Sequence, residues 1–198
     1  MKMHEAPRAP DDLQLPVELT GRSLVLTGFM GVGKSSVGRI LATRLGRQFF
    51  DSDNLVRQEL GAGPETLFPA GREADFRRGE AVVVARMVRS GRHVLALGGG
   101  ALLDPGTREL LLRDAFLVHL EVPWAELQPV LSALRPGRPL LAGRTDAEIH
   151  RLYLDRLAVY RTAHLSVVIG RNSPERAAEE VLEALRARSG RPPGGKQT

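Results

Sequence analysis

The chain has 198 residues, of which 42% are hydrophobic and 26% are charged, so we expect one folded domain and exclude a wholly disordered or fibrous protein. It contains no cysteine, no apolar run long enough to span a membrane and no N-terminal stretch typical of a signal peptide, which predicts a cytoplasmic protein without disulfides or thiolate metal sites. The formal net charge of +5 would suit an anionic ligand or a nucleic acid, yet only three of the 28 cationic side chains are lysine.

Short aliphatic runs and longer helical patterns alternate between residues 22 and 188, which we interpret as one domain. The aliphatic runs predict buried strands at residues 23–27, 47–50, 93–97, 115–120 and 166–169. The helical patterns cover residues 35–45, 75–88, 107–112, 124–134, 146–160 and 174–185. This alternation predicts a three-layer α/β/α sandwich around a central parallel sheet of about five strands, with ligands bound beyond the carboxyl ends of the strands. Residues 1–21 and 189–198 lack periodicity and are rich in proline, so we expect a flexible N-terminal extension and a disordered C-terminal tail.

The first predicted strand is followed by Gly28-Phe-Met-Gly-Val-Gly-Lys34-Ser35, which matches the phosphate-binding pattern G-x-x-x-x-G-K-[ST] and leads directly into a helical pattern. Glycines allow such a loop to wrap around phosphate oxygens, and the helix N-terminus adds the positive end of its dipole. Lys34, the only lysine outside the terminal segments, would reach the β- and γ-phosphates, and the Ser35 hydroxyl would bind Mg²⁺. We therefore expect a nucleotide site, ahead of the alternative of a glycine-rich turn that only joins a strand to a helix.

Two aspartates end the second predicted strand in the run Phe49-Phe-Asp51-Ser-Asp53. The carboxyl end of this strand is expected to lie beside the phosphate loop, so one carboxylate would face Mg²⁺ and the other a substrate hydroxyl. The same Asp-Ser-Asp run is also typical of the start of a helix, and both interpretations stay open at this point. Because the chain is short for a motor protein and lacks the Asn-Lys-x-Asp run of guanine-specific switches, a small-molecule kinase fits the nucleotide site better.

Arg77 and Glu80 lie three residues apart near the start of the helical pattern 75–88. At this spacing the carboxylate can hold the guanidinium in one pose. An oriented arginine would suit a substrate that carries a carboxylate. The alternative is an ordinary ion pair on a solvated helix face.

Three consecutive glycines, at positions 98–100, end the third predicted strand. Glycine is a poor strand residue, so its use here predicts the close approach of a ligand or of another backbone segment. We expect these glycines to form the floor of a pocket, with a plain loop as the alternative.

Residues 135–144 lie between two helical patterns and contain glycine, proline and three arginines. This composition is typical of a mobile lid that would carry Arg138 to the transferred phosphate. In the next helical pattern, Arg156 and Tyr160 lie near the end of the helix, where Arg156 would add a second cation to the acceptor pocket. Taken alone, each arginine is also typical of ordinary surface charge.

In order and spacing, five segments between about residues 24 and 185 resemble the shikimate kinase family, P-loop kinases related to the nucleoside monophosphate kinases. These segments are GFMGVGKSS, FFDSDN, EADFRRGE, LGGGA, and RPLLAG followed by R-x-x-x-Y. The resemblance implies a P-loop kinase fold with a mobile lid. It also implies an enzyme that transfers phosphate from ATP to the 3-hydroxyl of shikimate, giving shikimate 3-phosphate in the pathway to chorismate and the aromatic amino acids.

For ATP and Mg²⁺, the resemblance implies a nucleotide cradle built from Gly31, Val32, Gly33, Lys34, Ser35 and Ser36. Ser35 would bind the metal directly, and Asp51 would hold it through water.

For shikimate, the resemblance implies that Asp53 binds the hydroxyls and accepts the proton of the attacking one. Arg77 and Arg156 would hold the carboxylate, and the Gly99 backbone would contact the ring hydroxyls. Arg138 would move in with the lid and, with Lys34, stabilise charge on the γ-phosphoryl group. Catalysis would come mainly from positioning and electrostatics, because phosphoryl transfer has a loose transition state.

The chain departs from the family pattern at a few positions. The family motif R-x-P-L-Y reads RLAVY here, and Arg72 stands where glycine is usual before Glu73. Leu131 replaces an arginine that packs on adenine in the family, which makes Arg135 a candidate substitute. None of these positions is an expected shikimate ligand.

Two rival functions stay open. One is another small-molecule P-loop kinase, acting on gluconate or a nucleotide, whose acceptor would not need Asp53, Arg77 and Arg156 together. The other is a non-catalytic regulator that binds nucleic acid through its arginines, but such a protein would be expected to have lost its catalytic positions. We expect a monomer that binds ATP and shikimate, and neither nucleic acid nor a membrane.

Overall fold

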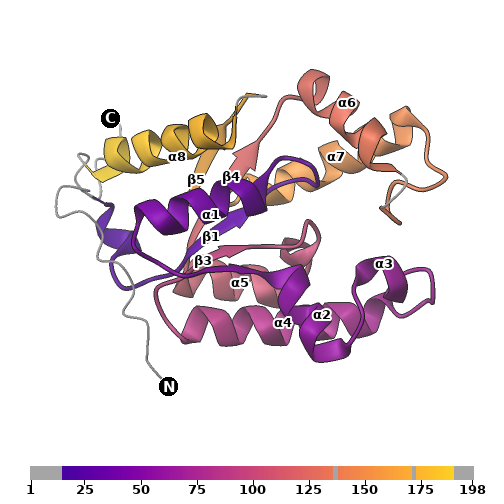
Figure 1. The fold of residues 1–198 in the computed structure, drawn as a ribbon, viewed down its shortest axis with the longest axis horizontal. Coiled ribbons are helices and arrows are strands. Elements are labelled where there is room, and N and C mark those ends of the chain that lie inside the picture. Colours follow the sequence, from indigo (N-terminus) through magenta and orange to yellow (C-terminus); the bar gives the residue numbers. More distant parts are fainter. Residues whose placement is uncertain (1–14, 136–137, 171–172, 190–198) are drawn as a thin grey trace.

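Five short strands form one parallel sheet in the order β2-β3-β1-β4-β5 (Figure 1). The strands are β1 (Leu24–Thr27), β2 (Phe49–Asp51), β3 (Val94–Ala96), β4 (Phe116–Glu121) and β5 (Leu165–Val168). Each neighbouring pair is parallel, and Val25 of β1 lies opposite Leu95 of β3 and Leu117 of β4. The structure is a computed structural model that describes residues 15–135, 138–170 and 173–189. The predicted five-stranded parallel sheet is thus confirmed.

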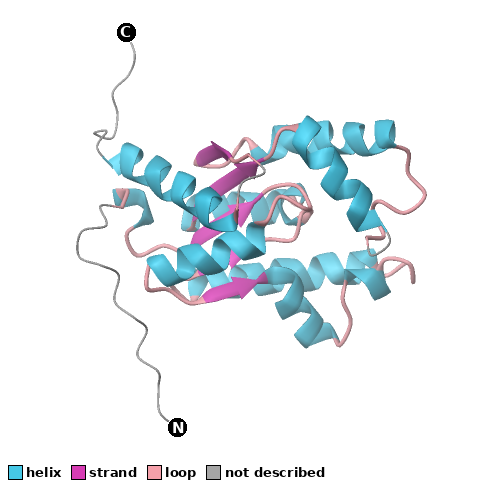
Figure 2. Cartoon of the chain, turned by 45° about the horizontal axis from the view of Figure 1, so that its top comes forward, coloured by secondary structure: helices cyan, strands magenta, loops and turns pink. Residues whose placement is uncertain are grey.

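Helices flank this sheet on both sides and make it the middle of three layers. They are α1 (Lys34–Arg44), α2 (Ser52–Leu60), α3 (Pro64–Leu67), α4 (Glu73–Arg89), α5 (Pro105–Asp114), α6 (Trp124–Leu134), α7 (Asp146–Tyr160) and α8 (Pro174–Ser189). Helices α1 and α8 pack against each other on one face, and α4 and α5 pack together on the other (Figure 2). Short 3-10 helices occur at η1 (Val17–Leu19) and η2 (Ala101–Leu103). The three-layer α/β/α sandwich expected from the alternating pattern is confirmed.

The central strands are aliphatic on both faces because both faces are covered. Leu24, Val25 and Leu26 of β1 are fully buried, as are Phe116 and Leu117 of β4. A strand in such a sheet shows a continuous apolar run rather than an alternating one. The buried strands give the loops at their carboxyl ends a rigid base.

The predicted helical patterns do not include α2 and α3, although a helix start at the Asp-Ser-Asp run was one of the two interpretations of that segment. Gly61 ends α2 in the left-handed conformation, with φ of +68°, and Gly63 and Pro64 begin α3 immediately afterwards. With nine and four residues, these helices are too short to show a clear apolar period, so the glycines and the proline dominate the local pattern. Both lie beyond the carboxyl end of β2, on the side where ligands were expected.

The packed body begins before residue 22. Leu19 of η1 is fully buried, and Leu15 packs against the core. For residues 15–21, a packed segment therefore replaces the predicted flexible extension, because two leucines gain more from burial than the short turn loses in chain entropy. Residues 1–14 and 190–198 lie outside the described residues. Within the described ranges, no helix combines the length and the apolar character needed to cross a membrane.

Candidate active site

The loop between β1 and α1 folds back over the end of the sheet, as the phosphate-binding pattern predicts. Gly28 has φ of +145°, and a Cβ there would lie 2.5 Å from the backbone oxygen of Leu120, so only glycine fits. Gly33, with φ of +89°, is the N-cap of α1. The first-turn amide groups of α1 and the positive end of its dipole therefore face the region enclosed by the loop.

Lys34 lies at the start of α1, and its side chain turns back along its own loop. Its Nζ donates hydrogen bonds to the carbonyl oxygens of Gly28, at 2.8 Å, and Phe29, at 2.9 Å. Burial lowers the pKa of Lys34 from 10.5 to about 8, although the charges of Asp53 and Asp51 oppose this change. An anionic phosphate beside the ammonium would favour the charged form again.

Asp51 uses its two carboxylate oxygens for different contacts. Its Oδ2 accepts a hydrogen bond of 2.6 Å from the Ser35 hydroxyl, while its Oδ1 accepts from the backbone N–H groups of Asp53, at 3.1 Å, and Asn54, at 3.3 Å. Asp51 is therefore the N-cap of α2 and also pairs with the phosphate loop. The structure thus confirms the start of a helix at Asp51, and the roles of the two aspartates toward Mg²⁺ and a substrate hydroxyl stay a prediction.

Asp53 points from the first turn of α2 into the space between the phosphate loop and the glycine loop. It lines the cavity around Lys34 and the adjoining cavity around Arg77. Burial raises the pKa of Asp53, and the negative charge of Asp51 adds to this, whereas Lys34 opposes it. A carboxylate with a raised pKa is a better proton acceptor than an exposed one.

The cavity next to the phosphate loop combines three arginines with aromatic and glycine residues. It is lined by Met30, Asp53, Pro64, Glu65, Phe68, Phe76, Arg77, Gly98, Gly99, Gly100, Arg138, Pro139, Leu140 and Arg156. We call this cavity the acceptor pocket. All the residues expected to bind shikimate line it.

Arg77 is held on several sides within the acceptor pocket. Its Nη1 lies 2.7 Å from Glu80 Oε2 and its Nη2 lies 3.1 Å from Glu73 Oε1. Its guanidinium carbon lies 5.2 Å from the ring centre of Phe68 and 5.5 Å from that of Phe76. Burial alone would lower the pKa of Arg77, but the carboxylates of Glu80 and Glu73 outweigh it and raise the pKa. The predicted fixed pose is confirmed, since Glu80 is only 2% exposed and is no surface partner.

Arg156 comes from α7 on the other side of the pocket and is only 5% exposed. Its Nη1 donates to the Gly99 carbonyl at 3.2 Å, and its guanidinium carbon lies 5.7 Å from the ring centre of Phe29. Its Nε is buried without a hydrogen-bond partner, and no carboxylate of the described residues forms an ion pair with it. Glu80, which is paired with Arg77, also interacts electrostatically with Arg156, and a pocket with two guanidinium groups around one buried carboxylate suits an anionic ligand.

The glycine loop, Gly98–Gly99–Gly100, forms the floor between the two cavities. The Gly98 N–H donates to the Ser52 hydroxyl at 2.8 Å. A Cβ on Gly98 would overlap Asp53 Oδ1 and Glu80 Oε1, and a Cβ on Gly100 would lie 2.5 Å from Arg77 Nη2. The glycines are thus closely approached by the side chains of Asp53, Glu80 and Arg77, rather than by the ligand or backbone segment that was expected.

The cavity around the phosphate loop shares five residues with the acceptor pocket: Met30, Asp53, Gly98, Gly99 and Arg138. It is lined by Met30, Gly31, Gly33, Lys34, Ser35, Ser36, Asp51, Asp53, Leu97, Gly98, Gly99, Val130, Leu134 and Arg138. Arg138 is exposed at the mouth of both cavities, although residues 136–137 of the predicted lid lie outside the described residues. A group transferred from one cavity to the other would pass between Asp53 and Arg138.

A third, aliphatic cavity adjoins the outer side of the phosphate loop. It is lined by Gly31, Val32, Gly33, Val37, Val122, Leu127, Val130, Ile169, Gly170, Pro174 and Ala177. Leu131 is not among these residues because it is buried in the core, at 1% exposure. Arg135 forms an ion pair with Asp146 and does not line this cavity.

Several pocket residues were not expected from the sequence. Phe68 and Leu140 lie in segments without a clear period, and Met30 occupies a variable position of the loop pattern. Phe76 could have been identified, because it stands beside Arg77 in the segment EADFRRGE and an aromatic face is a common partner of a guanidinium.

Comparison with known proteins agrees with this geometry. A family model described as shikimate kinase matches residues 30–186. A shikimate kinase from Symbiobacterium thermophilum is 38% identical over 175 residues, which is 85% of this chain and 99% of that protein. One from Nitrosomonas europaea is 37% identical over 166 residues, covering 83% of this chain and 78% of that protein.

Solved structures show the same relationship. The shikimate kinase from Acinetobacter baumannii, in complex with shikimate, has a TM-score of 0.75 and 32% identity, covering 82% of this chain and 91% of that chain. A gluconokinase from Sinorhizobium meliloti, with a TM-score of 0.54 and 20% identity over 83% of this chain and 91% of its own, shares the fold alone. The family model covers most of the chain, and both curated relatives are matched over more than two thirds of their length. This protein belongs to the shikimate kinase family.

Proposed function

We propose that this protein is a shikimate kinase that transfers the γ-phosphoryl group of ATP to the 3-hydroxyl of shikimate. The observation that carries the proposal is the buried guanidinium of Arg156, which has no carboxylate partner among the described residues and lines the same pocket as Arg77. Two guanidinium groups across one small pocket suit a carboxylate, and Asp53 beside them suits a hydroxyl. Shikimate carries both groups on one ring.

The nucleotide would lie along α1, with its phosphates in the cavity around Lys34. The loop amides, the helix dipole and the Lys34 ammonium all favour negative charge there. The aliphatic cavity beside Val32 would take the adenine ring. Because Leu127, Val130 and Pro174 line it and no arginine does, adenine would be held by apolar packing.

Mg²⁺ fits the oxygen atoms of Ser35 and Asp51. Their hydrogen bond of 2.6 Å shows that a hydroxyl and a carboxylate oxygen already converge at the phosphate cavity. Among the described residues no cluster of three or more acidic or histidine side chains could hold a metal alone, which suits an ion that is shared with phosphates and water. When bound, the ion would neutralise part of the phosphate charge.

Shikimate would bind in the acceptor pocket with its carboxylate between Arg77 and Arg156. Phe68, Phe76 and Met30 would cover the apolar faces of the ring, and Asp53 would accept hydrogen bonds from the hydroxyls. This arrangement would direct one hydroxyl toward the phosphate cavity, past Asp53.

The chemical step would then follow from position and charge. The 3-hydroxyl oxygen forms a bond to the γ-phosphorus, the bond from that phosphorus to the bridging β–γ oxygen breaks, and ADP leaves. The hydroxyl proton passes to the Asp53 carboxylate, whose pKa is raised by burial. Lys34 and Arg138 stabilise the charge that spreads over the transferred group.

The proposal is tested by measuring ADP release in a coupled assay with a panel of acceptors. Shikimate should support turnover, and gluconate and nucleoside monophosphates should give at most background rates, because gluconate is an open chain without a ring to fill the space between Phe68, Phe76 and Met30, and nucleoside monophosphates carry no carboxylate. Preferred turnover of gluconate or a nucleotide would replace the proposal with the rival kinase function. DNA binding that weakens with salt, without any ATP turnover, would favour the non-catalytic regulator instead.

A further inference from the structure

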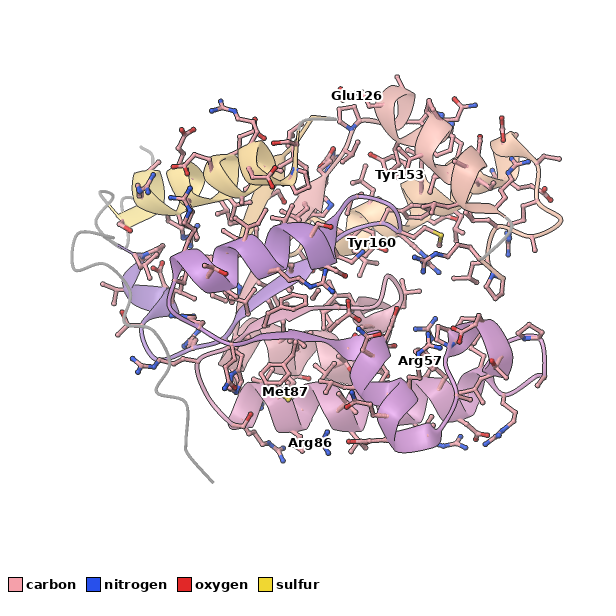
Figure 3. All side chains as sticks on the ribbon, in the orientation of Figure 1. Arg57, Arg86, Met87, Glu126, Tyr153 and Tyr160 are labelled. Carbon is pink, nitrogen blue, oxygen red and sulfur yellow. The ribbon has the colours of Figure 1, made fainter. Side chains whose placement is uncertain are left out.

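We infer that Tyr160 is a positioning residue of the acceptor pocket, which fixes the Gly99 carbonyl and, through it, the guanidinium of Arg156. The inference rests on the proposed function, because it names what aligns a proposed shikimate ligand. Tyr160 lies at the end of α7 (Figure 3) and is only 1% exposed. Its hydroxyl donates a hydrogen bond of 2.5 Å to the carbonyl of Gly99, 61 residues away in the chain.

The Gly99 carbonyl accepts two hydrogen bonds, from the Tyr160 hydroxyl at 2.5 Å and from Arg156 Nη1 at 3.2 Å. A carbonyl oxygen has two lone pairs, so both are in use. Within the described residues, the carbonyl is thus occupied by two protein donors. It connects the glycine loop to the arginine of α7.

Such a connection matters because glycine has more backbone freedom than any other residue. Gly98 is anchored through its N–H to Ser52 Oγ, and its carbonyl accepts from Ala101 N–H at 3.1 Å. For Gly99, the described residues provide only the two bonds to its carbonyl. The orientation of the peptide between Gly99 and Gly100 therefore depends on Tyr160 and Arg156.

The tyrosine ring is itself held in place. It lies against His119 of β4, with ring centres 5.5 Å apart, and His119 Nδ1 lies 3.3 Å from Ser166 Oγ of β5. Burial lowers the pKa of His119 to about 4, so this imidazole is neutral near pH 7. Burial also raises the pKa of Tyr160, although the charge of Arg156 and a side-chain hydrogen bond with it act in the opposite direction, so its hydroxyl stays protonated and contacts both the Gly99 carbonyl and Arg156. Strands β4 and β5 thus hold the Tyr160 ring in place, and with it the hydroxyl that contacts the glycine loop.

The orientation of the Arg156 guanidinium depends on the Gly99 carbonyl more than the orientation of Arg77 does. Arg77 is held by two carboxylates, whereas Arg156 has no ion pair with a described residue and has a buried Nε without a partner. The hydrogen bond that Arg156 Nη1 donates to the Gly99 carbonyl fixes the orientation of the guanidinium plane. Loss of the Tyr160 hydroxyl would release that carbonyl and leave the plane less well defined.

The test is Tyr160→Phe, which removes the hydroxyl and keeps the ring. The shikimate KM should rise roughly tenfold, as expected for the loss of one ordering hydrogen bond, while kcat and the ATP KM stay within about twofold of the wild type.

The matched control is Tyr153→Phe. Tyr153 also lies on α7, is also buried, and donates to a backbone carbonyl, that of Val122, at 3.2 Å, but it does not line the acceptor pocket (Figure 3). Its variant should keep the wild-type shikimate KM.

A double-mutant cycle separates positioning from a general structural role. If Tyr160 acts through Arg156, then adding Tyr160→Phe to Arg156→Lys should raise the shikimate KM by less than about twofold, because the guanidinium to be aligned is already gone. If Tyr160→Phe raised the shikimate KM of Arg156→Lys by a further factor of about ten, the inference would be overturned. A wild-type shikimate KM in the single variant Tyr160→Phe would also overturn it. Equal increases in the KM for shikimate and the KM for ATP would overturn the inference as well, because they would indicate a damaged fold.

Calorimetric titration with shikimate keeps the inference separate from the proposed function. If shikimate binds with an affinity that depends on Tyr160 but no ADP is released, only the proposed function fails. If ADP is released and Tyr160→Phe binds shikimate like the wild type, only the inference fails. A wild-type protein that does not bind shikimate at all would contradict both.

Discussion

At the scale of single residues, the chemistry of the site depends on how each charge is surrounded. Lys34 is half-buried and bound to two carbonyl oxygens, so burial lowers its pKa to about 8. An arginine in the same place would stay charged at any pH. The lysine can therefore lose its proton near the upper end of the physiological range.

We predict that ATP binding weakens as the pH rises above about 8. Phosphate binds the charged form of Lys34, and the free protein loses that form with a pKa of about 8, so ATP binding must take up a proton above this pH. Between pH 7 and pH 9 the ATP Kd should rise roughly tenfold. Titration calorimetry at several pH values measures this change.

The control for this prediction is Lys34→Arg. Its ATP affinity should be lower than that of the wild type, because a guanidinium does not fit the small loop, but it should not change between pH 7 and pH 9. A wild-type Kd that is constant over the same range would show that Lys34 is not the group that binds phosphate.

At the scale of elements, the glycine loop after β3 shows that a missing side chain can be a structural requirement. Gly100 has φ of −111°, which alanine adopts easily, so its backbone conformation does not demand glycine. The lack of space does demand glycine, because a Cβ would lie 2.5 Å from Arg77 Nη2. Arg77 is held by Glu80 and Glu73, so it would move only by giving up those contacts.

We predict that Gly100→Ala damages shikimate binding and leaves the fold intact. Displacement of the Arg77 guanidinium by about an ångström should raise the shikimate KM on the order of a hundredfold, with little change in the ATP KM or the melting temperature. Steady-state kinetics and thermal unfolding measure these quantities.

Gly106→Ala is the matched control, since the nearest atom to a Cβ there, Asp104 Oδ2, is 3.4 Å away. It should behave like the wild type. If Gly100→Ala also kept the wild-type shikimate KM, Arg77 would not be fixed by this loop.

At the scale of the whole molecule, the strand order brings the two halves of the site together. The phosphate loop follows β1, the glycine loop follows β3, and Asp53 follows β2, so three neighbouring strands end at the same place. Helix α7 reaches the same place from the other side with Arg156. The described residues that line the acceptor pocket therefore come from segments brought together by the sheet and by α7.

We therefore predict that shikimate alone stabilises the protein. At a concentration of 100 times its Kd, a ligand that binds only the folded state should raise the melting temperature of a domain of this size by roughly 5–10 °C. Differential scanning calorimetry with shikimate, without ATP, measures this shift. Arg156→Lys should reduce the shift at the same shikimate concentration, and a shift that appears only when nucleotide is present would contradict a preformed pocket.

The sequence by itself determined the parts of this protein that depend on near neighbours in the chain. Continuous aliphatic runs predicted the five strands, and the spacing of Gly28, Gly33, Lys34 and Ser35 predicted the phosphate loop, because strand burial and loop curvature are set within a few residues. The pairing of Arg77 with Glu80 could also be predicted from the sequence, since residues three apart lie on the same face of a helix.

Only the tertiary structure decided what depends on distant contacts. The bond from Ser35 to Asp51, the bond from Arg156 to Gly99 and the bond from Tyr160 to Gly99 all join segments that are far apart in the chain. Such contacts are set by which strands lie side by side and by how helices pack across them. A local pattern contains no information on these distances, so the alignment of the acceptor pocket became visible only once the sheet was assembled.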